Sequence, residues 1–235
     1  MPYSTAHKQQ TRARILRAAA RAFRAEGIAG VSVPEVMRAV GLTHGGFYAH
    51  FASKDALASE ACATAFGEAA ERLFDQAARA APDEALPGIV RAYLSRAHRD
   101  QPEEGCVVPT LGAEVARGAP AVRAAFTHAL RAYARRLAAY MPARDAEPPR
   151  VEAAQISAYE SVHEDEALVL LAGMAGALQL ARAVDDPDLS DGILRAARTF
   201  YLAAFGTSDD SANPVTEHLA AKVTSGTAET PAGEL

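Results

Sequence analysis

Apolar residues recur along the chain at the spacing of three and four residues that is typical of amphipathic α-helices. The segment 11–26 shows the pattern, and its apolar face consists of Ile15, Leu16, Ala19, Ala22 and Phe23. Further apolar stripes and runs predict helices over 54–80, 89–99, 106–117, 120–141, 164–184 and 190–205. Pro82 and Pro87 are expected to bracket a loop. Because no alternating strand pattern is evident, the sequence predicts an all-α fold.

Two short helices joined by a tight turn are predicted near the N-terminus. Ser32 and Glu35 have capping-box spacing, and Pro34 lies in the first turn, where its missing N–H is not needed. Gly41 follows the last apolar position, as in helices that end on a left-handed residue, and Thr43 can cap the next helix. This is the helix-turn-helix pattern, whose second helix enters the major groove of DNA.

Charge is distributed unevenly along the 235 residues. The formal net charge is −5, yet residues 1–50 carry +5, which leaves −10 for the remainder. A basic end on an acidic body is expected where only that end meets phosphate, although a solvated helix face would look the same. The helix-turn-helix beside it favours DNA. The basic residues are Lys8, Arg12, Arg14, Arg17, Arg21, Arg24 and Arg38.

Roughly residues 10–70 resemble the TetR/AcrR family of bacterial transcriptional regulators. The resemblance rests on Thr11-Arg12, Ile15-Leu16, Ala19, Phe23, Gly27, Ser32 to Thr43, Phe47-Tyr48-Ala49-His50-Phe51, Ser53-Lys54 and Leu57. It implies a three-helix DNA-binding domain at 10–70 and a larger helical domain at 71–206 for effector binding and dimerisation. Residues 207–235 are rich in Ser, Thr, Asp, Gly and Pro, which predicts a disordered tail.

Candidate DNA contacts follow from the predicted second helix. Its start offers backbone N–H groups to phosphate and side chains to base edges, and the aromatic end and the following helix start supply further phosphate contacts. Tyr48 could instead be a packing aromatic. Family members often carry a lysine and a hydroxyl residue where His44 and Gly46 stand, so a different base preference is expected here. The candidates are Thr43, His44, Gly45, Gly46, Tyr48, His50 and Lys54.

The resemblance also implies an effector pocket between the central helices of the larger domain. Its candidate lining residues, each of which could equally be core, are Tyr93, His98, Cys106, Leu111, Phe126, Leu130 and Tyr133. Gly105-Cys106 is similar to a branch of the family in which a cysteine here senses electrophiles or oxidants. Glu103 and Glu104 oppose this by raising the thiol pKa, and a buried inert cysteine is the alternative.

A homodimer is a further implication, with the last two helices of each chain forming a four-helix bundle. The small residues around Gly173 and Gly176 fit such an interface, and they fit close packing inside one chain equally well. The candidate interface residues are Leu168, Leu171, Ala175 and Leu178.

The sequence therefore predicts a ligand-responsive transcriptional repressor that binds a palindromic operator as a dimer and is released by a small effector. It is expected to be cytoplasmic, without a membrane span, metal or cofactor, because a signal peptide and a disulfide framework are not evident and the run 167–178 is shorter than the roughly 20 residues of a span. An enzymatic alternative is a helical-bundle metal oxidase using Glu160 and His163, although di-iron bundles need two Glu-x-x-His pairs. Another alternative is a DNA-binding scaffold that takes no ligand.

Overall fold

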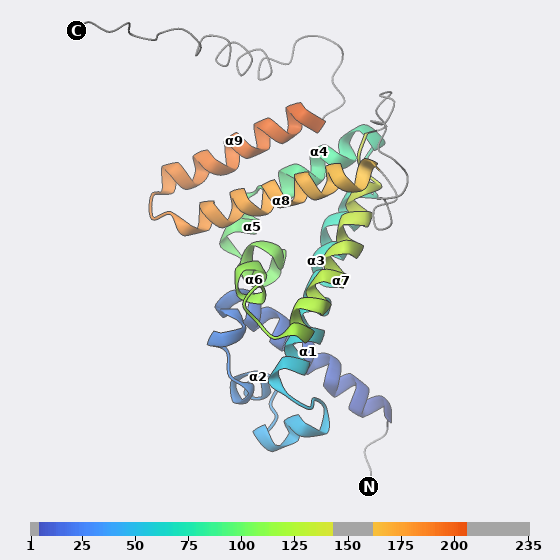
Figure 1. The fold of residues 1–235 in the computed structure, drawn as a ribbon, viewed down its shortest axis with the longest axis vertical. Coiled ribbons are helices and arrows are strands. Elements are labelled where there is room, and N and C mark those ends of the chain that lie inside the picture. The colour runs from blue at the N-terminus through green and yellow to red at the C-terminus, as the bar shows by residue number, and fades with distance from the viewer. Residues whose placement is uncertain (1–4, 143–161, 206–235) are drawn as a thin grey trace, which may run out of the picture.

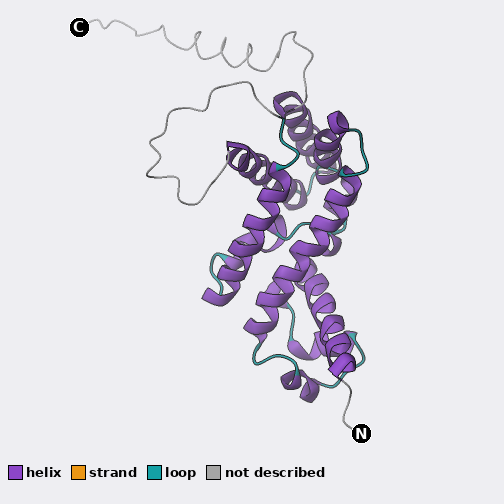
Figure 2. Cartoon of the chain, turned by 90° about the vertical axis from the view of Figure 1, so that its right-hand side faces the viewer, coloured by secondary structure: helices purple, strands orange, loops and turns teal. Residues whose placement is uncertain are grey.

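The computed structural model describes residues 5–142 and 162–205, and within these ranges it is helical and contains no strand (Figure 2). Figure 1 shows an elongated molecule with the first helices at one end and the last two at the other. The elements are α1 Thr5–Gly30, α2 Val33–Ala39, the 3-10 helix η1 His44–Ala49, α3 Lys54–Ala77, α4 Pro82–Tyr93, α5 Arg96–Asp100, the 3-10 helix η2 Pro102–Glu104, α6 Val108–Val115, α7 Pro120–Ala138, α8 Val162–Ala183 and α9 Pro187–Phe205.

Local signals set the geometry of the helix-turn-helix as predicted. The Glu35 carboxylate accepts the Ser32 N–H at 2.7 Å, and the Ser32 hydroxyl accepts the Glu35 N–H at 3.4 Å, which completes the capping box. Gly41 has a φ of 73°, the left-handed conformation that favours glycine. The second helix differs from expectation, because η1 is a 3-10 helix and Thr43 gives it no side-chain cap.

α3 and α7 run side by side through the middle of the molecule and join its two ends (Figure 1). α3 starts beside the helix-turn-helix and its last turns pack among the helices of the larger part. The predicted domain boundary at residue 70 therefore falls inside one continuous helix. The division into 10–70 and 71–206 stays a prediction, and the predicted tail at 207–235 lies outside the described residues.

Three predicted helix boundaries are wrong. α4 begins at Pro82 and contains Pro87, because the burial of its apolar face outweighs the missing backbone hydrogen bond. The predicted helix 89–99 breaks after α4, and the Ser95 hydroxyl caps α5 by accepting the His98 N–H. α9 begins at Pro187 rather than 190, since Asp186 caps its first N–H groups.

The face of α8 predicted to form a dimer interface packs mostly inside the single chain. Leu171, Ala175 and Leu178 are 2%, 4% and 0% exposed within the single chain, and Leu168 is half-buried, so this stripe packs in the core. A side chain buried in its own chain cannot contact a second copy.

The stretch His163–Ala183 has a mean hydropathy of 1.3 and is long and apolar enough to cross a membrane. The sequence argument considered only the run 167–178, whereas the whole helix reaches the length of a membrane span. One face of this helix packs against α7 and α9.

Candidate DNA-binding surface and effector cavity

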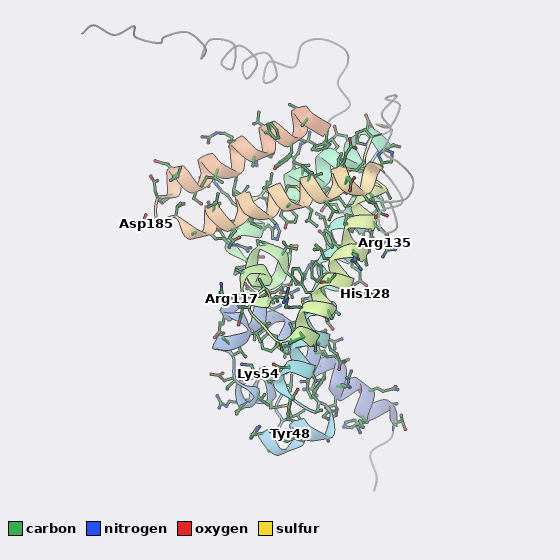
Figure 3. All side chains as sticks on the ribbon, viewed as in Figure 1. Tyr48, Lys54, Arg117, His128, Arg135 and Asp185 are labelled. Atoms are coloured by element: carbon green, nitrogen blue, oxygen red, sulfur yellow. The ribbon has the colours of Figure 1, made fainter. Side chains whose placement is uncertain are left out.

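The end of the molecule that carries η1 exposes most of the predicted DNA contacts. Thr43, His44 and Gly45 are exposed, and the Tyr48 side chain is 67% exposed, so Tyr48 is free to meet a ligand rather than buried as core (Figure 3). Phe47 is fully buried beneath it and holds η1 against the small domain. Gly46 and His44 complete this surface: Gly46 packs near Met37, and the His44 ring lies 6.0 Å from the Tyr48 ring. Phe51 is buried below the surface, where it stacks on Phe47.

Lys54 and His50 flank this surface and differ in charge. Lys54 begins α3 next to Ser53, whose hydroxyl accepts the Ala56 N–H at 3.1 Å. The positive end of a helix dipole and the lysine together attract an anion at this point. Desolvation, with smaller contributions from Lys8 and Arg12, lowers the pKa of His50. His50 is therefore neutral at pH 7 and can act on phosphate only as a hydrogen-bond donor.

The arginines of α1 do not form one exposed basic face, which corrects the expectation for Arg24. Its side chain is fully buried and donates to the Ala65 carbonyl at 3.2 Å and to the Glu68 carboxylate at 3.0 Å. Arg24 therefore ties α1 to α3 inside the small domain. Arg12 is paired with Glu60 and lies over the Phe51 ring, at 4.6 Å from its centroid. The charge available to DNA is smaller than the sequence count suggests.

A cavity of about 240 Å³ lies between the last turns of α3, the end of α4, α5 and the segment before α6. Four of the predicted pocket residues line it, namely Tyr93, His98, Cys106 and Tyr133. The other three do not line it. Leu111 is buried in the core, and Phe126 and Leu130 are half-buried on α7.

His98 fixes the wall of this cavity. Its Nε2 accepts the Cys106 N–H at 2.9 Å, so Nδ1 carries the proton and donates to the Tyr93 carbonyl at 2.7 Å. Burial lowers the pKa of His98 to about 4, which keeps the ring neutral. A Cβ on Gly105 would lie 2.6 Å from the ring, so only glycine allows this approach.

Cys106 and Tyr93 meet at the inner side of the cavity. Burial raises the pKa of the Cys106 thiol, despite opposing effects of Tyr93, the Val108 N–H and Arg182. The thiol is therefore protonated at neutral pH, and it precedes the start of α6 by two residues. The Tyr93 hydroxyl is buried near the thiol, but within the described part of the chain it has no hydrogen-bond partner of ordinary geometry.

Two carboxylates connect this region to α1. Glu104, which lines the cavity, pairs with Arg21 of α1 through one oxygen and with Arg72 of α3 through the other. Glu114 of α6 accepts the N–H groups of Ile28 and Ala29 at 2.8 and 2.6 Å, where α1 bends at Gly27. The cavity wall and the DNA-binding helices are thus joined by direct ion pairs and hydrogen bonds.

Residues 15–61 match the family model described as bacterial regulatory proteins of the tetR family. The match spans most of α1, the whole helix-turn-helix and the start of α3, which are the elements that present Tyr48 and Lys54. The N-terminal domain belongs to the TetR family. The chain is therefore a DNA-binding transcriptional regulator with a TetR-type helix-turn-helix domain, and regulators of this family are generally not enzymes.

Solved structures share the fold of this TetR-family chain. The reduced form of NemR from E. coli has a TM-score of 0.66 at 18% identity and covers 86% of this chain and 100% of its own. A TetR-family regulator from Cytophaga hutchinsonii has a TM-score of 0.65 at 20% identity, covering 89% and 100%. A transcriptional regulator from Saccharomonospora viridis in complex with choline has a TM-score of 0.60 at 19% identity, covering 82% and 96%. No curated protein is significantly similar to the chain in sequence.

The sequence missed the contribution of α3 to the cavity of this TetR-family protein. Ala69, Arg72, Leu73 and Gln76 line it from one face of that helix, and Glu104 lines it from η2. The spacing of three and four residues along α3 was visible. The meeting of α3 with η2 depends on contacts between distant parts of the chain.

The enzymatic alternative is not tested fully by the structure, because Glu160 lies outside the described residues. The His163 Nδ1 lies 3.7 Å from a carboxylate oxygen of Glu166. In the ranges 5–142 and 162–205, no three His, Cys, Asp or Glu side chains are grouped so that they could hold a metal ion.

Proposed function

We propose that this TetR-family regulator is a repressor that binds a palindromic operator as a homodimer and is released when a small effector enters the cavity at Tyr93, His98 and Cys106. In this proposal residues 10–70 form the DNA-binding domain and 71–206 form the effector and dimerisation domain. The DNA contacts are the seven residues named above, with Tyr48 and Lys54 as the central phosphate contacts and His50 as a neutral donor.

The exposure of Tyr48 over a buried Phe47 is the observation that carries the DNA-binding part of the proposal. An aromatic side chain that is 67% exposed next to a fully buried one is not needed for packing. It lies on the same end of the molecule as Lys54, beside the start of α3 (Figure 3). A tyrosine hydroxyl and an ammonium group near a helix N-terminus suit the phosphate backbone of a duplex.

Dimerisation is supported by apolar surface on α8 and α9. On α8, Val169 and Leu180 are 62% and 59% exposed, and on α9 Phe200 is 47% exposed. Together with smaller neighbours they form one exposed stripe on each helix, and the two helices lie side by side (Figure 1). Two copies could bury these stripes against each other and present two η1 helices to two half-sites. The exposed stripe residues are Val169, Ala172 and Leu180 of α8, with the half-buried Gly176 between them, and Ala196, Phe200 and Ala203 of α9.

Effector binding is supported by the cavity itself. Its size and mixed lining suit a small molecule, and the unpartnered Tyr93 hydroxyl gives such a molecule a hydrogen bond. The choline complex of the Saccharomonospora viridis regulator gives one example of a small ligand on this fold. The cavity and the buried Tyr93 hydroxyl beside it favour the effector-binding proposal over a scaffold that takes no ligand.

The direct test is binding of the purified full chain to the DNA upstream of its own gene, measured by fluorescence anisotropy. We expect saturable binding by a dimer, with an affinity that falls steeply with salt, and footprinting is expected to reveal two symmetric half-sites. Tyr48→Ala is expected to weaken binding, whereas Tyr140→Ala, which alters an aromatic of α3–α7 packing far from η1, provides the control for general destabilisation. Binding that is independent of salt and unaffected by Tyr48→Ala contradicts the proposal.

A further inference from the structure

The charged residues that line the cavity are Arg72 and Glu104, and Arg21 of α1 adds a second cation behind this wall. The guanidinium groups of Arg21 and Arg72 share the single carboxylate of Glu104. Arg72 also donates to the Glu104 carbonyl oxygen, so both of its terminal nitrogens are directed at one residue beside the cavity. Two cations and one anion leave this group of three side chains with a net charge of +1. A bound anion would neutralise it.

A third cation, Arg182 of α8, adds to the positive field. It donates to the carbonyl oxygens of His98 and Arg99, and its Nη1 is buried without a hydrogen-bond partner among the described residues. It lies against Gly105, which lines the cavity, since a Cβ there would be 3.4 Å from the guanidinium. The charges of Asp100 and Glu103 raise the pKa of Arg182, but the described contacts pair neither carboxylate with it. A cation held only by carbonyl dipoles favours an anion nearby.

The interior of the cavity has a different character. Leu73, Tyr133 and Cys106 give it apolar walls, and the buried Tyr93 hydroxyl has no hydrogen-bond partner of ordinary geometry among the described residues. An engineered apolar cavity of roughly 150 Å³ holds benzene. The 240 Å³ available here has room for one such ring, or an aliphatic chain of similar size, with two small substituents.

From these observations we propose that the cavity binds a small organic acid, with an apolar body against Tyr133 and Leu73, a second polar atom at the Tyr93 hydroxyl, and a carboxylate that replaces Glu104 as the partner of Arg72. This proposal rests on the proposed function, because it names the class of effector and the route by which the effector acts. The guanidinium of Arg72 suits such an exchange, since it can hold one carboxylate through two parallel hydrogen bonds.

The exchange reaches the DNA-binding domain through Arg21. Glu104 holds Arg21 and Arg72 at once, so an acid that takes Arg72 also moves the carboxylate that anchors α1. Exposed ion pairs are weak, and the Arg21 and Arg72 side chains are 56% and 46% exposed, so a ligand can compete for them. The acid thereby favours a state in which α1 is no longer tied to the cavity wall, and operator affinity falls in that state.

The first experiment compares acids with neutral amides of the same shape by titration calorimetry on the full chain. The probes are benzoate, 4-hydroxybenzoate, phenylacetate and hexanoate, each against its amide. We expect the acids to bind about tenfold or more tightly than the amides, and Arg72→Gln to remove this preference. Tyr93→Phe should remove any advantage of 4-hydroxybenzoate over benzoate. If no acid binds, or if amides bind as tightly as acids, the proposal is wrong.

The second experiment tests the route through Glu104 without any ligand. Glu104→Gln removes the charge that holds Arg21 and is expected to weaken operator binding about 2- to 20-fold, because both chains of a dimer lose the link. It should also abolish the further loss caused by a binding acid. Glu84→Gln breaks a more exposed ion pair, with Arg91 on α4, and is the control for loss of a surface carboxylate. Equal operator affinity in wild type and Glu104→Gln contradicts the route.

The two levels of the proposal fail in different ways. If the chain does not bind DNA from its own promoter in a salt-dependent manner, the proposed function is wrong whatever the acids do. If DNA binding is normal but acids show no preference over amides, the effector class is wrong and the regulator assignment stands. Circular dichroism of each variant confirms that the helices are intact before either comparison.

Discussion

The carboxylate of Glu114 accepts the backbone N–H of Ile28 at 2.8 Å, and in this way α6 holds the end of the first DNA-binding helix. The second oxygen accepts the Ala29 N–H, so one side chain satisfies two N–H groups at the bend that follows Gly27. Gly27 has a φ of 80°, and a Cβ there would lie 2.9 Å from this carboxylate. Glycine at position 27 leaves room for the Glu114 carboxylate, and this carboxylate in turn satisfies the N–H groups that the bend exposes.

Replacing Glu114 tests this contact between α6 and the end of α1. Glu114→Gln removes the charge and one of the two acceptors, and we expect a loss of about 2 kcal/mol in the free energy of unfolding, or about 4–8 °C in Tm. Operator affinity should also fall. Thermal and urea unfolding measure the first effect and anisotropy the second. Glu71→Gln, which changes an exposed carboxylate of α3, should leave both unchanged. A Glu114→Gln protein that matches wild type would show that the bend needs no such anchor.

Lys54 is predicted to contact phosphate. Lys54→Ala is expected to weaken binding to all DNA sequences alike and to make the slope of log K against log salt shallower by roughly 1 per half-site, because one fewer counterion is released. Arg135→Ala removes one positive charge from α7, towards the other end of the molecule, and should not alter the slope (Figure 3). An unchanged slope and affinity for Lys54→Ala would remove Lys54 from the DNA-binding surface.

The dimer interface can be tested by two substitutions on α8 that differ in the face they alter. Val169→Asp places a charge on the exposed stripe and is expected to give a folded monomer with weakened operator binding. Ala175→Asp places the same charge in the core of the single chain and should instead destabilise folding. Analytical ultracentrifugation and circular dichroism separate the outcomes. A Val169→Asp protein that remains a stable dimer would place the interface elsewhere.

Cys106 is predicted to respond to alkylation only slowly, because burial raises the pKa of its thiol. Once a bulky group is attached, it adds volume to a packed region, which costs about 1–3 kcal/mol and would weaken operator binding about 5- to 150-fold. Mass spectrometry and anisotropy after N-ethylmaleimide treatment measure both effects. Cys62→Ser and Cys106→Ser serve as paired controls, since both cysteines are buried. If Cys106→Ser responds as wild type does, the thiol has no part in control.

His98 predicts a pH dependence of stability. Its pKa is lowered from 6.5 to about 4 in the folded chain, so the unfolded chain takes up a proton in this window and the folded chain does not. The stability due to the neutral ring is complete above pH 6.5 and is lost as the pH falls towards 4, by about 3 kcal/mol. Urea unfolding at several pH values should show this loss in wild type and much less of it in His98→Gln. His128→Gln, an exposed histidine of α7, should behave as wild type (Figure 3).

Features set by neighbouring residues were predictable from the sequence. The capping pair Ser32 and Glu35, the left-handed Gly41 and the cap at Ser53 all occur as expected, because each depends on a few adjacent residues. The family resemblance was visible for the same reason, since the helix-turn-helix is a local motif. These features locate the DNA-binding end of the molecule.

Features set by distant contacts were not predictable. α8 carries apolar residues on nearly all sides, so its periodicity could not show that Leu171 faces the core while Val169 faces outwards. The burial of Arg24 depends on the Ala65 carbonyl and on Glu68, which lie on another helix. The cavity depends likewise on the meeting of α3, α5 and η2. For α1 and α8 the sequence predicted the helix but could not determine which of its side chains face the core.

α3 is a single helix of 24 residues that carries Lys54 at its first turn and cavity residues such as Arg72 near its last. Inserting one residue between them would rotate the two ends by about 100° relative to each other and separate them by about 1.5 Å. A chimera that exchanges effector domains between regulators of this fold must therefore preserve the rotation between the two ends of α3. A junction within α3 must keep the number of residues between Ser53 and Arg72, or change it by about seven, which restores the rotation to within about 20° but adds two turns of length.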